Sequence, residues 1–439
     1  MVETNTAELK KVICAAIDAN ENKIVSYAKD VAKEPELGFK EAKTAAKVAA
    51  IFEELKIEYQ EGLAITGVKG RIKGGKKGPT VAILGELDAI GCPDSLAADP
   101  LTGAAHACGH NLQTAAMLGA AYGLVKSGVM SELAGDVVFF GVPAEEYVEL
   151  AYRKKLIEEG KLHFLHGKGE LIYRGEFADI DMAMQIHADK NMPEATVSIG
   201  QSSNGFIGKT IQYVGKTAHA ADAPDQGINA LNAAMLGLMG INALRETFRE
   251  KDVVRVHPII TKGGDLVNSV PADVRIETYV RAKSMEAIEA THKKVDAALK
   301  AGGDAVGAQT IIETLPGQLP LACNEKMNEL FVANARIADP KVAVKDAGHF
   351  SASTDMGDVS HLMPVIHPFI GGTNGLLHTK DFCVVSYKDA VMLPAKAFAM
   401  MIVDLLADDA KGAKDILANY KPLLTREEYV KKLEGYFSK

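Results

Sequence analysis

Possible metal ligands follow three apolar segments of the chain, each with the composition of a buried strand. In chain order these side chains are Cys108, His110, Glu145, Glu146 and His187, and a later histidine, His378, completes the set. The carboxyl ends of parallel strands meet at one edge of a sheet, which is where ligands bind in open α/β folds. A thiolate, imidazoles and carboxylates suit Zn, Mn, Co or Fe(II) and are wrong for a Ca or Mg site. The pattern therefore predicts a transition-metal centre.

Each of these residues has a simpler explanation when it is taken alone. A Cys-x-His pair is often a buried thiol near an incidental histidine, and an isolated histidine is usually a satisfied core or surface residue. A Glu-Glu pair is usually part of a solvated surface. The position of Glu145 and Glu146 argues otherwise, because they follow an apolar strand at 137–142, where an unpaired charge is costly.

The number of candidate ligands indicates two metal ions. The predicted ligands are Cys108, His110, Glu146, His187 and His378. This set exceeds what one catalytic zinc with an open position needs, so we predict two divalent ions, Zn or Mn, that share a bridging hydroxide. Glu145 is adjacent to a ligand and is the expected general base, which takes a proton and passes it to a leaving amine. Asp88 ends the first strand and is expected to orient a ligand histidine.

The surrounding elements predict an α/β domain into which a second module is inserted. Apolar runs predict buried parallel strands at 81–88, 137–142 and 182–186, and helical periodicity predicts helices at 6–31, 40–55, 112–125 and 387–408. From about 192 the pattern changes to alternating strands and two long helices, which is typical of an independent α+β module. We expect this module to end at 303 and the chain to return to the first domain with a strand at 310–313. The predicted domains are therefore 1–191 with 304–439, and 192–303.

The composition excludes several classes of function. The chain has 439 residues and a net charge of −8, without the basic face that nucleic acid or an anionic membrane requires. We expect no apolar run of membrane-spanning length and no signal core in residues 1–12. The five cysteines are scattered and odd in number, which favours free thiols in a reducing compartment. We therefore expect a cytoplasmic protein.

Five motifs stand in the order found in a known group of metallopeptidases. They are Glu34-Pro35-Glu36-Leu37-Gly38-Phe39, Glu86-Leu87-Asp88-Ala89, His106-Ala-Cys108-Gly-His110, Pro143-Ala-Glu145-Glu146 and Gly215-Lys-Thr-Ala-His219-Ala-Ala. Over nearly its whole length the chain resembles the co-catalytic metallopeptidases of the carboxypeptidase G and aminoacylase type. It is most similar to their amidohydrolase subfamily of hippurate, auxin-conjugate and aminobenzoyl-glutamate hydrolases. The segment 353–360 and Cys108-Gly-His110-Asn111 resemble the aminobenzoyl-glutamate branch. Many relatives carry Asp-x-His where this chain has Asn111 and Gln113.

The resemblance implies a fold, an activity and further site residues. The implied fold is a mixed, mostly parallel sheet flanked by helices, of the phosphorylase/hydrolase type, with an inserted ferredoxin-like domain that serves in dimerisation or as a lid. The implied activity is cleavage of the amide bond of an N-acyl or N-aroyl amino acid, such as aminobenzoyl-glutamate, by a homodimer. The resemblance also places His219 near the scissile carbonyl, in its own or the partner subunit's site. It places Asn268 and Arg281 near the substrate carboxylate.

Three alternatives stay open at this point. A dipeptidase or deacetylase of the same fold would use the same metal site on other substrates. A non-catalytic binding protein would keep the fold without the reaction, although every ligand position and Glu145 are filled. A cysteine hydrolase built on Cys108 would keep its activity after chelation by EDTA, whereas a metal enzyme would lose it.

Overall fold

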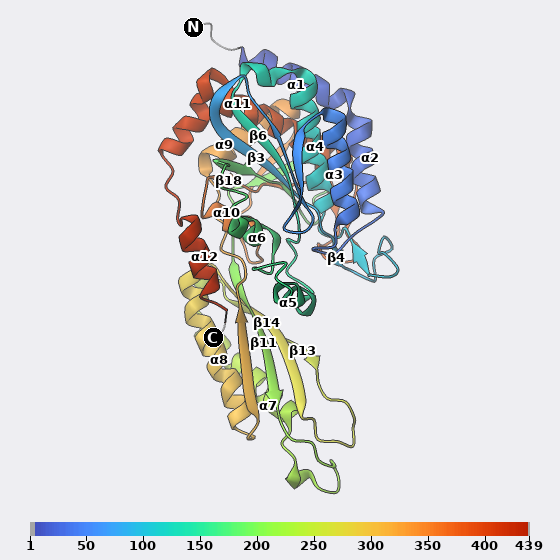
Figure 1. The fold of residues 1–439 in the computed structure, drawn as a ribbon, viewed down its shortest axis with the longest axis vertical. Coiled ribbons are helices and arrows are strands. Elements are labelled where there is room, and N and C mark those ends of the chain that lie inside the picture. Colours follow the sequence, from blue (N-terminus) through green and yellow to red (C-terminus); the bar gives the residue numbers. More distant parts are fainter. Residues whose placement is uncertain (1–4, 438–439) are drawn as a thin grey trace. The chain divides into compact units, whose positions relative to one another are not determined.

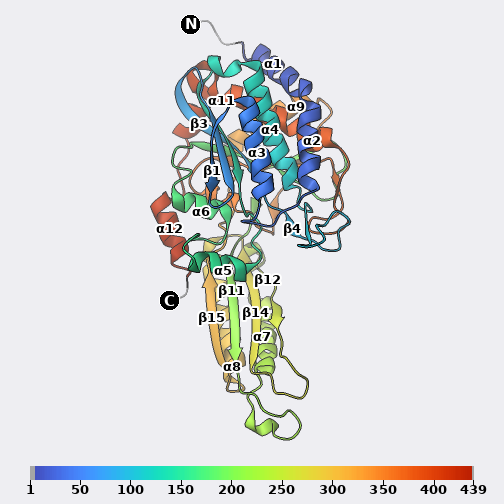
Figure 2. The same ribbon diagram turned by 45° about the vertical axis from the view of Figure 1, so that its right-hand side comes forward.

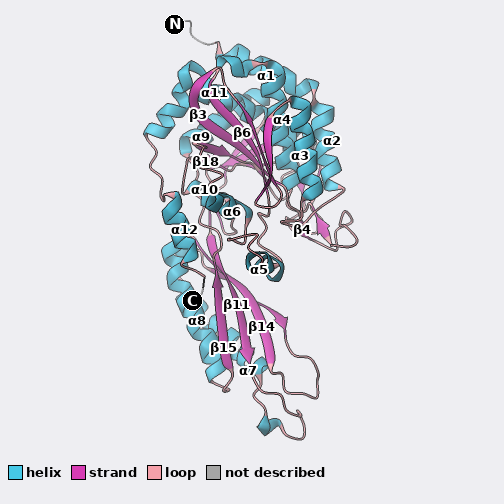
Figure 3. Cartoon of the chain, viewed as in Figure 1, coloured by secondary structure: helices cyan, strands magenta, loops and turns pink. Residues whose placement is uncertain are grey.

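The computed structural model describes residues 5–437 and divides the chain into two compact units. The first unit holds the chain up to Ser202, together with Ala322–Gly348 and Asp358–Arg426. The second unit holds Ser203–Leu321, His349–Gly357 and the chain from Glu427. Figure 3 distinguishes the helices and strands of both units by colour.

A six-stranded sheet forms the centre of the first unit, in the order β1-β2-β6-β3-β7-β18 (Figure 1). Its strands are β1 (Glu58–Leu63), β2 (Gly67–Ile72), β3 (Lys76–Glu86), β6 (Ala134–Val142), β7 (Met182–Met184) and β18 (Val365–Ile366). The four strands β6, β3, β7 and β18 pair in parallel, while β1 and β2 are antiparallel to their neighbours. Residues 81–84 and 137–140 are fully buried, as expected for parallel strands covered on both faces. The predicted mixed, mostly parallel α/β fold is confirmed.

Several helices surround this sheet in the first unit. Their bounds are α1 (Thr6–Ala19), α2 (Glu21–Ala32), α3 (Ala42–Leu55), α4 (His110–Ser127), α5 (Leu150–Glu158), α6 (Gly167–Arg174), α9 (Glu325–Ala338) and α11 (Leu393–Ala418). Both α4 and α11 pack on β3 and β6. The helix predicted at 6–31 is two helices, because Asn20 interrupts it by donating its side-chain amide to the carbonyl of Ala16 at 2.8 Å. A Cβ on Gly85 would lie 2.8 Å from the Cα of Thr114, so this glycine lets α4 lie close to β3.

One helical stretch in residues 5–437, Lys388–Ala418, is long and apolar enough by length and composition to cross a membrane. The expectation that no apolar run approaches that length is therefore wrong for this segment. The most apolar 18 residues of this stretch are 89% buried inside the fold. The backbone leaves the helical conformation at Ala407–Ala410. A buried core helix passes the same test of length and composition, so the finding carries no membrane assignment.

Short strands fix the segments around the predicted ligands. They are β4 (Ile90–Gly91), β5 (Ala104–Ala105), β8 (His187–Ala188), β9 (Thr196–Ile199), β16 (Ala343–Asp346), β19 (Phe369–Ile370), β20 (Thr373–Asn374) and β21 (Cys383–Val384). His187 begins β8, which pairs in parallel with β19. His378 lies in the connection between β20 and β21, which pair as a hairpin. The remaining short elements are β10 (Ser202–Ser203), β17 (His349–Phe350), α10 (Met356–Ser360) and α12 (Arg426–Glu434).

The second unit is an antiparallel sheet in the order β12-β14-β11-β15, with two helices packed against it (Figure 2). Its elements are β11 (Gly205–Val214), β12 (Arg255–Val256), β13 (Ile259–Lys262), β14 (Asp273–Ala282), β15 (Gln309–Leu315), α7 (Ala230–Leu244) and α8 (Met285–Asp304). Burial alternates along β14, which is the pattern of a sheet covered on one face. The edge strand β13 pairs with β14. The sequence pattern predicted this α+β arrangement.

The boundaries of the second unit differ from the predicted 192 and 303. The strand expected at 310–313 to return to the first domain is β15, and it pairs with β11 in the second unit. The pair Gly302-Gly303 does not mark an exit, because α8 continues through it. A Cβ on Gly302 would lie 2.4 Å from the backbone nitrogen of Gly237. Gly302 therefore allows α7 and α8 to pack closely, and the glycine pair does not end the helix.

Candidate metal centre and active site

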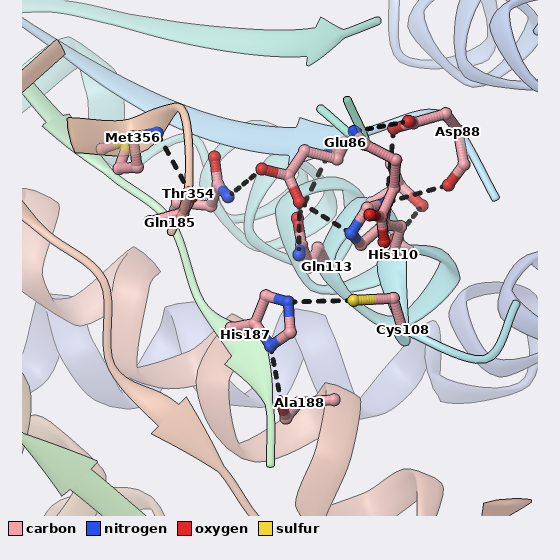
Figure 4. A network of polar contacts seen from close by, with 12 residues as sticks. Glu86, Asp88, Cys108, His110, Gln113, Gln185, His187, Ala188, Thr354 and Met356 are labelled. Atoms are coloured by element: carbon pink, nitrogen blue, oxygen red, sulfur yellow. Dashed lines mark hydrogen bonds and ion pairs between the residues drawn. The ribbon is translucent and has the colours of Figure 1, made fainter. Parts of the chain in front are cut away.

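Three neighbouring parallel strands of the first unit end at one edge of the sheet. The sheet order is β6-β3-β7, so the end of β3 at Glu86 lies between the ends of the other two strands. The turn 143–146 follows β6, and His187 lies three residues after the end of β7. Helix α4 begins at His110 on the same edge, as Figure 4 shows for the residues that it labels.

Cys108 lies at the centre of a cluster that contains all five predicted ligands. Its Sγ is 3.3 Å from Nε2 of His187 and 3.3 Å from Nε2 of His378. Nε2 of His378 is also 3.1 Å from Oε1 of Glu146. The donor atoms form two triads, Cys108/His110/His187 and Cys108/Glu146/His378, and the atoms of each triad lie within 4.8 Å of one another. The two triads share the sulfur, so these five side chains could together hold two divalent ions.

Backbone conformation brings the loop of Cys108 and the loop of His378 together. Gly109 has a φ of +82°, and a Cβ there would lie 2.6 Å from the Cβ of Ala188, so glycine is required between the two ligands of this loop. His378 also has a positive φ, of 61°, which is uncommon for a residue with a side chain. Its backbone N–H donates to the carbonyl of Ala107 at 2.9 Å, which ties the two loops to each other.

The charges of the cluster favour the metal-binding forms of its acids. Burial raises the pKa of the Cys108 thiol, but the nearby His187, together with His110 and His378, outweighs burial and lowers the pKa to about 6. Burial also disfavours ionised Glu146, yet His378 holds the pKa of this carboxyl at about 2. A thiolate and a carboxylate at neutral pH are the forms that bind a metal.

Two buried atoms of the cluster are available to bind a metal ion. Nε2 of His110 and Oε1 of Glu146 each lie 3.1 Å from an oppositely charged group, Glu86 and His378 respectively, but neither atom makes a well-directed hydrogen bond to a residue between 5 and 437. Nδ1 of His110 is already engaged, at 2.8 Å from the carbonyl oxygen and 3.3 Å from Oδ1 of Asp88. A carboxylate on one ring nitrogen leaves the other ring nitrogen for a metal. The residues therefore fit a pair of divalent metal ions.

Glu145 belongs to a third group of possible ligands. One of its carboxylate oxygens lies within 4.8 Å of donor atoms of Glu86 and His110, whereas the neighbouring Glu146 belongs to the triad with Cys108. Glu145 as a whole residue is 8% exposed, whereas His378 is an exposed residue. A carboxylate that is buried beside the ligand cluster without being needed as a ligand has the position that a general base requires.

A buried ion pair beside His110 was missed by the sequence reasoning. Nζ of Lys168 is 2.6 Å from Oε1 of Glu86, and both side chains are fully buried. Oε2 of Glu86 is 3.1 Å from Nε2 of His110. Burial raises the pKa of Glu86, but Lys168 and His110 outweigh burial and hold it well below its usual range. Glu86 ends an apolar strand and could have been found by the argument applied to Glu146, whereas Lys168 follows no pattern.

Two glutamines complete the contacts of Glu86. Gln113 and Gln185 donate their side-chain amides to its carboxylate at 2.8 and 2.6 Å, and Figure 4 shows both contacts. Gln113 also accepts from the backbone N–H of Glu86 at 3.2 Å. Gln113 therefore holds the carboxylate that lies beside His110.

The predicted substrate residues His219 and Asn268 lie beside each other in the second unit. Nδ1 of His219 accepts from the backbone N–H groups of Ala221 and Asp222 at 3.3 and 3.0 Å, so the neutral ring carries its proton on Nε2. The side chain is exposed. The carbonyl of Asn268 accepts from the N–H of Ala220 at 2.9 Å. The two predicted residues therefore form one loop cluster.

Arg281 lies at the other end of the same sheet. It donates to Oγ of Ser353 at 2.9 Å, and its guanidinium stacks over the ring of Phe206 at 4.9 Å. Strand β14 begins at Asp273, after Asn268, and the eight residue steps from there to Arg281 span about 27 Å. Asn268 and Arg281 of one chain therefore cannot contact the same small substrate. The predicted pair can serve one substrate only if the two residues come from different subunits.

The chain is similar to known proteins both in sequence and in fold. A family model described as Peptidase family M20/M25/M40 matches residues 83–403. The chain is 28% identical to an Xaa-Arg dipeptidase of Mus musculus over 91% of its own length and 89% of the relative. It is 28% identical to one of the subunits of the p-aminobenzoyl-glutamate hydrolase of Escherichia coli K12, over 75% of its own length and 64% of the relative. A solved dinuclear metal-binding peptidase of the M20 family from Bacillus subtilis superposes with a TM-score of 0.65 at 22% identity, covering 89% of this chain and 99% of that one.

Proposed function

Because the chain belongs to peptidase family M20/M25/M40 and is thus a hydrolase, we propose that it cleaves the amide bond of an N-acyl or N-aroyl amino acid. Aminobenzoyl-glutamate is a representative substrate. The observation that carries the proposal is the meeting of five ligand side chains around Cys108, two of which, Cys108 and His378, are 270 positions apart in the chain. We propose two divalent ions, Zn or Mn, as the cofactors at this site. The cytoplasmic location stays a prediction from composition.

The chain's own residues have separate tasks in this reaction. Two divalent ions, when bound, polarise the amide carbonyl and make a water molecule more acidic. Glu145 takes a proton from the attacking water and donates it to the nitrogen of the leaving amine. Asp88 holds the ring of His110 through Nδ1, so that the opposite nitrogen keeps its direction. The burial of Glu145 limits the exchange of its proton with bulk water.

A dipeptidase is the second candidate function. The match to the mouse Xaa-Arg dipeptidase extends over more of both chains than the match to the aminobenzoyl-glutamate hydrolase does. A dipeptide and an N-acyl amino acid share the amide bond and the carboxylate, and they differ in the free amino group. The same ligand cluster and the same base would serve both substrates, so only turnover separates the two candidates.

A homodimer formed through the second unit is part of the proposal. Met239 on α7 and Ile259 on β13 are 64% and 61% exposed, and within residues 5–437 β13 pairs only with β14. Exposed apolar side chains beside an unpaired strand edge support association with a second copy. In such a dimer the two ends of β14 would contact different substrate molecules. That arrangement removes the conflict between Asn268 and Arg281, and it would let His219 act in the partner subunit's site.

A substrate panel tests the proposal. Protein loaded with Zn or with Mn is assayed against N-acetyl, N-benzoyl and aminobenzoyl amino acids and against free dipeptides, including some that end in arginine. We expect the N-acyl substrates to be hydrolysed fastest and Glu145→Ala to lose turnover while it keeps its metal. A preference for free dipeptides would establish the second candidate. Hydrolysis that persists after EDTA treatment would point to a thiol nucleophile, and no hydrolysis at all would point to a binding protein.

A further inference from the structure

The segment from Glu36 to Glu41 packs against the turn that carries Glu145 and Glu146. Most of it belongs to a motif that supports the family resemblance, and the proposed function gives it no role. The segment precedes α3, and Leu37 forms a parallel bridge with Ala89, next to Asp88. We call residues 143–146 the catalytic turn and residues 36–41 the bracing segment.

Polar groups bind the backbone of the catalytic turn on both sides of Glu145. The N–H of Ala144 donates to Oε1 of Glu41 at 2.8 Å, and its carbonyl accepts from the N–H of Gly167 at 3.0 Å. The N–H of Glu146 donates to Oδ2 of Asp88 at 3.0 Å. The carbonyl of Glu146 accepts from a guanidinium nitrogen of Arg153. Glu145 is therefore flanked by two residues whose backbone groups are all held.

Glu41 is placed for this contact and does not cap the helix that it precedes. It stands at the N-cap of α3, and its side chain makes no capping bond to any residue between 5 and 437. Glu36 does that instead, because its carboxylate accepts from the backbone N–H groups of Lys43 and Thr44 at 3.1 and 2.9 Å. The second oxygen of Glu41 accepts from Oγ1 of Thr66 at 2.6 Å. Glu41 is fully buried, and burying a carboxyl group costs free energy unless hydrogen bonds such as these offset it.

Arg153 holds the other side of the catalytic turn from α5. It is fully buried and also donates to the carbonyl of Leu165 at 2.6 Å. Phe39 of the bracing segment lies 5.2 Å from its guanidinium. A Cβ on Gly38 would lie 2.6 Å from Nη2 of Arg153 and 2.9 Å from the Cβ of Ala144. The bracing segment therefore leaves room for the arginine as well as supplying the carboxylate.

The catalytic turn needs support because its backbone is strained. Ala144 has a φ of +48°, a conformation that residues with a side chain avoid and that persists only where the surroundings impose it. We propose that Glu41 and Arg153 are positioning residues that impose this conformation and so keep Glu145 within reach of the proton that it transfers. The proposal rests on the proposed role of Glu145 as the base.

Four variants test the proposal, each assayed at saturating metal. Glu41→Ala and Arg153→Met remove the two supports. Glu41→Gln keeps an oxygen that accepts from the Ala144 N–H, and its amide NH2 can donate to Oγ1 of Thr66 in place of the present bond, in which Thr66 donates. The matched control is Lys69→Met, which removes another little-exposed cation that binds a backbone carbonyl of the first unit, that of Glu176 at 2.6 Å. The readouts are kcat and KM, bound metal, and hydrogen exchange of the peptide 143–148.

We expect Glu41→Ala and Arg153→Met to lower kcat about 100-fold, because a base displaced by about 1 Å loses that much. KM and bound metal should stay close to those of the wild type, exchange at 143–148 should rise, and Glu41→Gln should restore most of kcat. Lys69→Met should change neither kcat nor that exchange. Unchanged exchange at 143–148 in both support variants would overturn the proposal, as would a loss of kcat equal to that of the control. If the wild type hydrolyses nothing, the proposed function fails, while the exchange data still decide whether the supports hold the turn.

Discussion

Replacing Lys168 with methionine tests whether the buried ion pair beside His110 is an essential part of the fold at the site. Nζ of Lys168 lies 2.6 Å from Glu86 with both side chains fully buried, and removing one partner of such a pair costs about 3–5 kcal/mol. Glu86 keeps the amide donors of Gln113 and Gln185, so we expect the lower end, about 3 kcal/mol. That loss is a large part of the typical stability of a folded protein.

A double-mutant cycle measured by urea unfolding isolates the pair. Glu86→Gln alone leaves a buried ammonium group without its carboxylate, whereas Lys168→Met with Glu86→Gln removes both charges. The free energy of unfolding should therefore fall less in the double variant than the two single losses added together. We expect the difference to be about 1 kcal/mol or more, as is usual for two groups in direct contact. Lys76→Met is the control, because its pair with Asp409 is exposed and should contribute about 0–1 kcal/mol. Additive single effects, or a cost of Lys168→Met as small as that of the control, would refute the reasoning.

Three further predictions follow from single groups. Glu145→Gln should keep the fold and the metal and lower kcat by about 10²–10⁴-fold, the range of general acid–base catalysis; wild-type turnover in this variant would remove its assignment as the base. Burial raises the pKa of Asp273, but Arg275 and its other partners outweigh burial and lower it to about 2, so the carboxylate should stabilise the protein above pH 4 and this contribution should vanish as the pH falls through about 2. The stability difference from Asp273→Asn, expected at about 1 kcal/mol or less, should follow that pH course, and a difference that is the same at pH 2 and pH 7 would contradict it. Met239→Glu should convert the expected dimer to a monomer in sedimentation, and an unchanged mass would place the interface elsewhere.

The strands, and most of the candidate ligands that meet at their ends, could be predicted because their signals are local. Residues 81–84 and 137–140 are continuous apolar runs, which is what burial on both faces of a sheet requires. An acidic side chain at the end of such a run is costly to bury without a partner, so its presence there indicates a site. His378 was predicted by its residue type alone. Its contact with Cys108 depends on two backbone conformations with positive φ, at Gly109 and at His378 itself. The spacing of apolar and polar residues does not predict such conformations.

The buried charges could not be predicted from pattern. Lys168 and Arg153 are fully buried, yet sequence reasoning assigns such residues to the surface because that is where they usually lie. The pairing of β15 was also missed, since an apolar run predicts a strand without naming its neighbour. Likewise, the distance between Asn268 and Arg281 follows from the length of β14, and the motifs that contain these residues do not indicate it.

The count of metal ions bound per chain tests the proposed two-metal site most directly. Elemental analysis of Zn- or Mn-loaded protein after removal of unbound metal should give two ions for the wild type, with hydrolysis lost on chelation and restored by added metal. Cys108→Ala should lose most of both ions, because its sulfur belongs to both triads of donor atoms. One ion or none in the wild type, or hydrolysis that continues after complete chelation, would contradict the two-metal site.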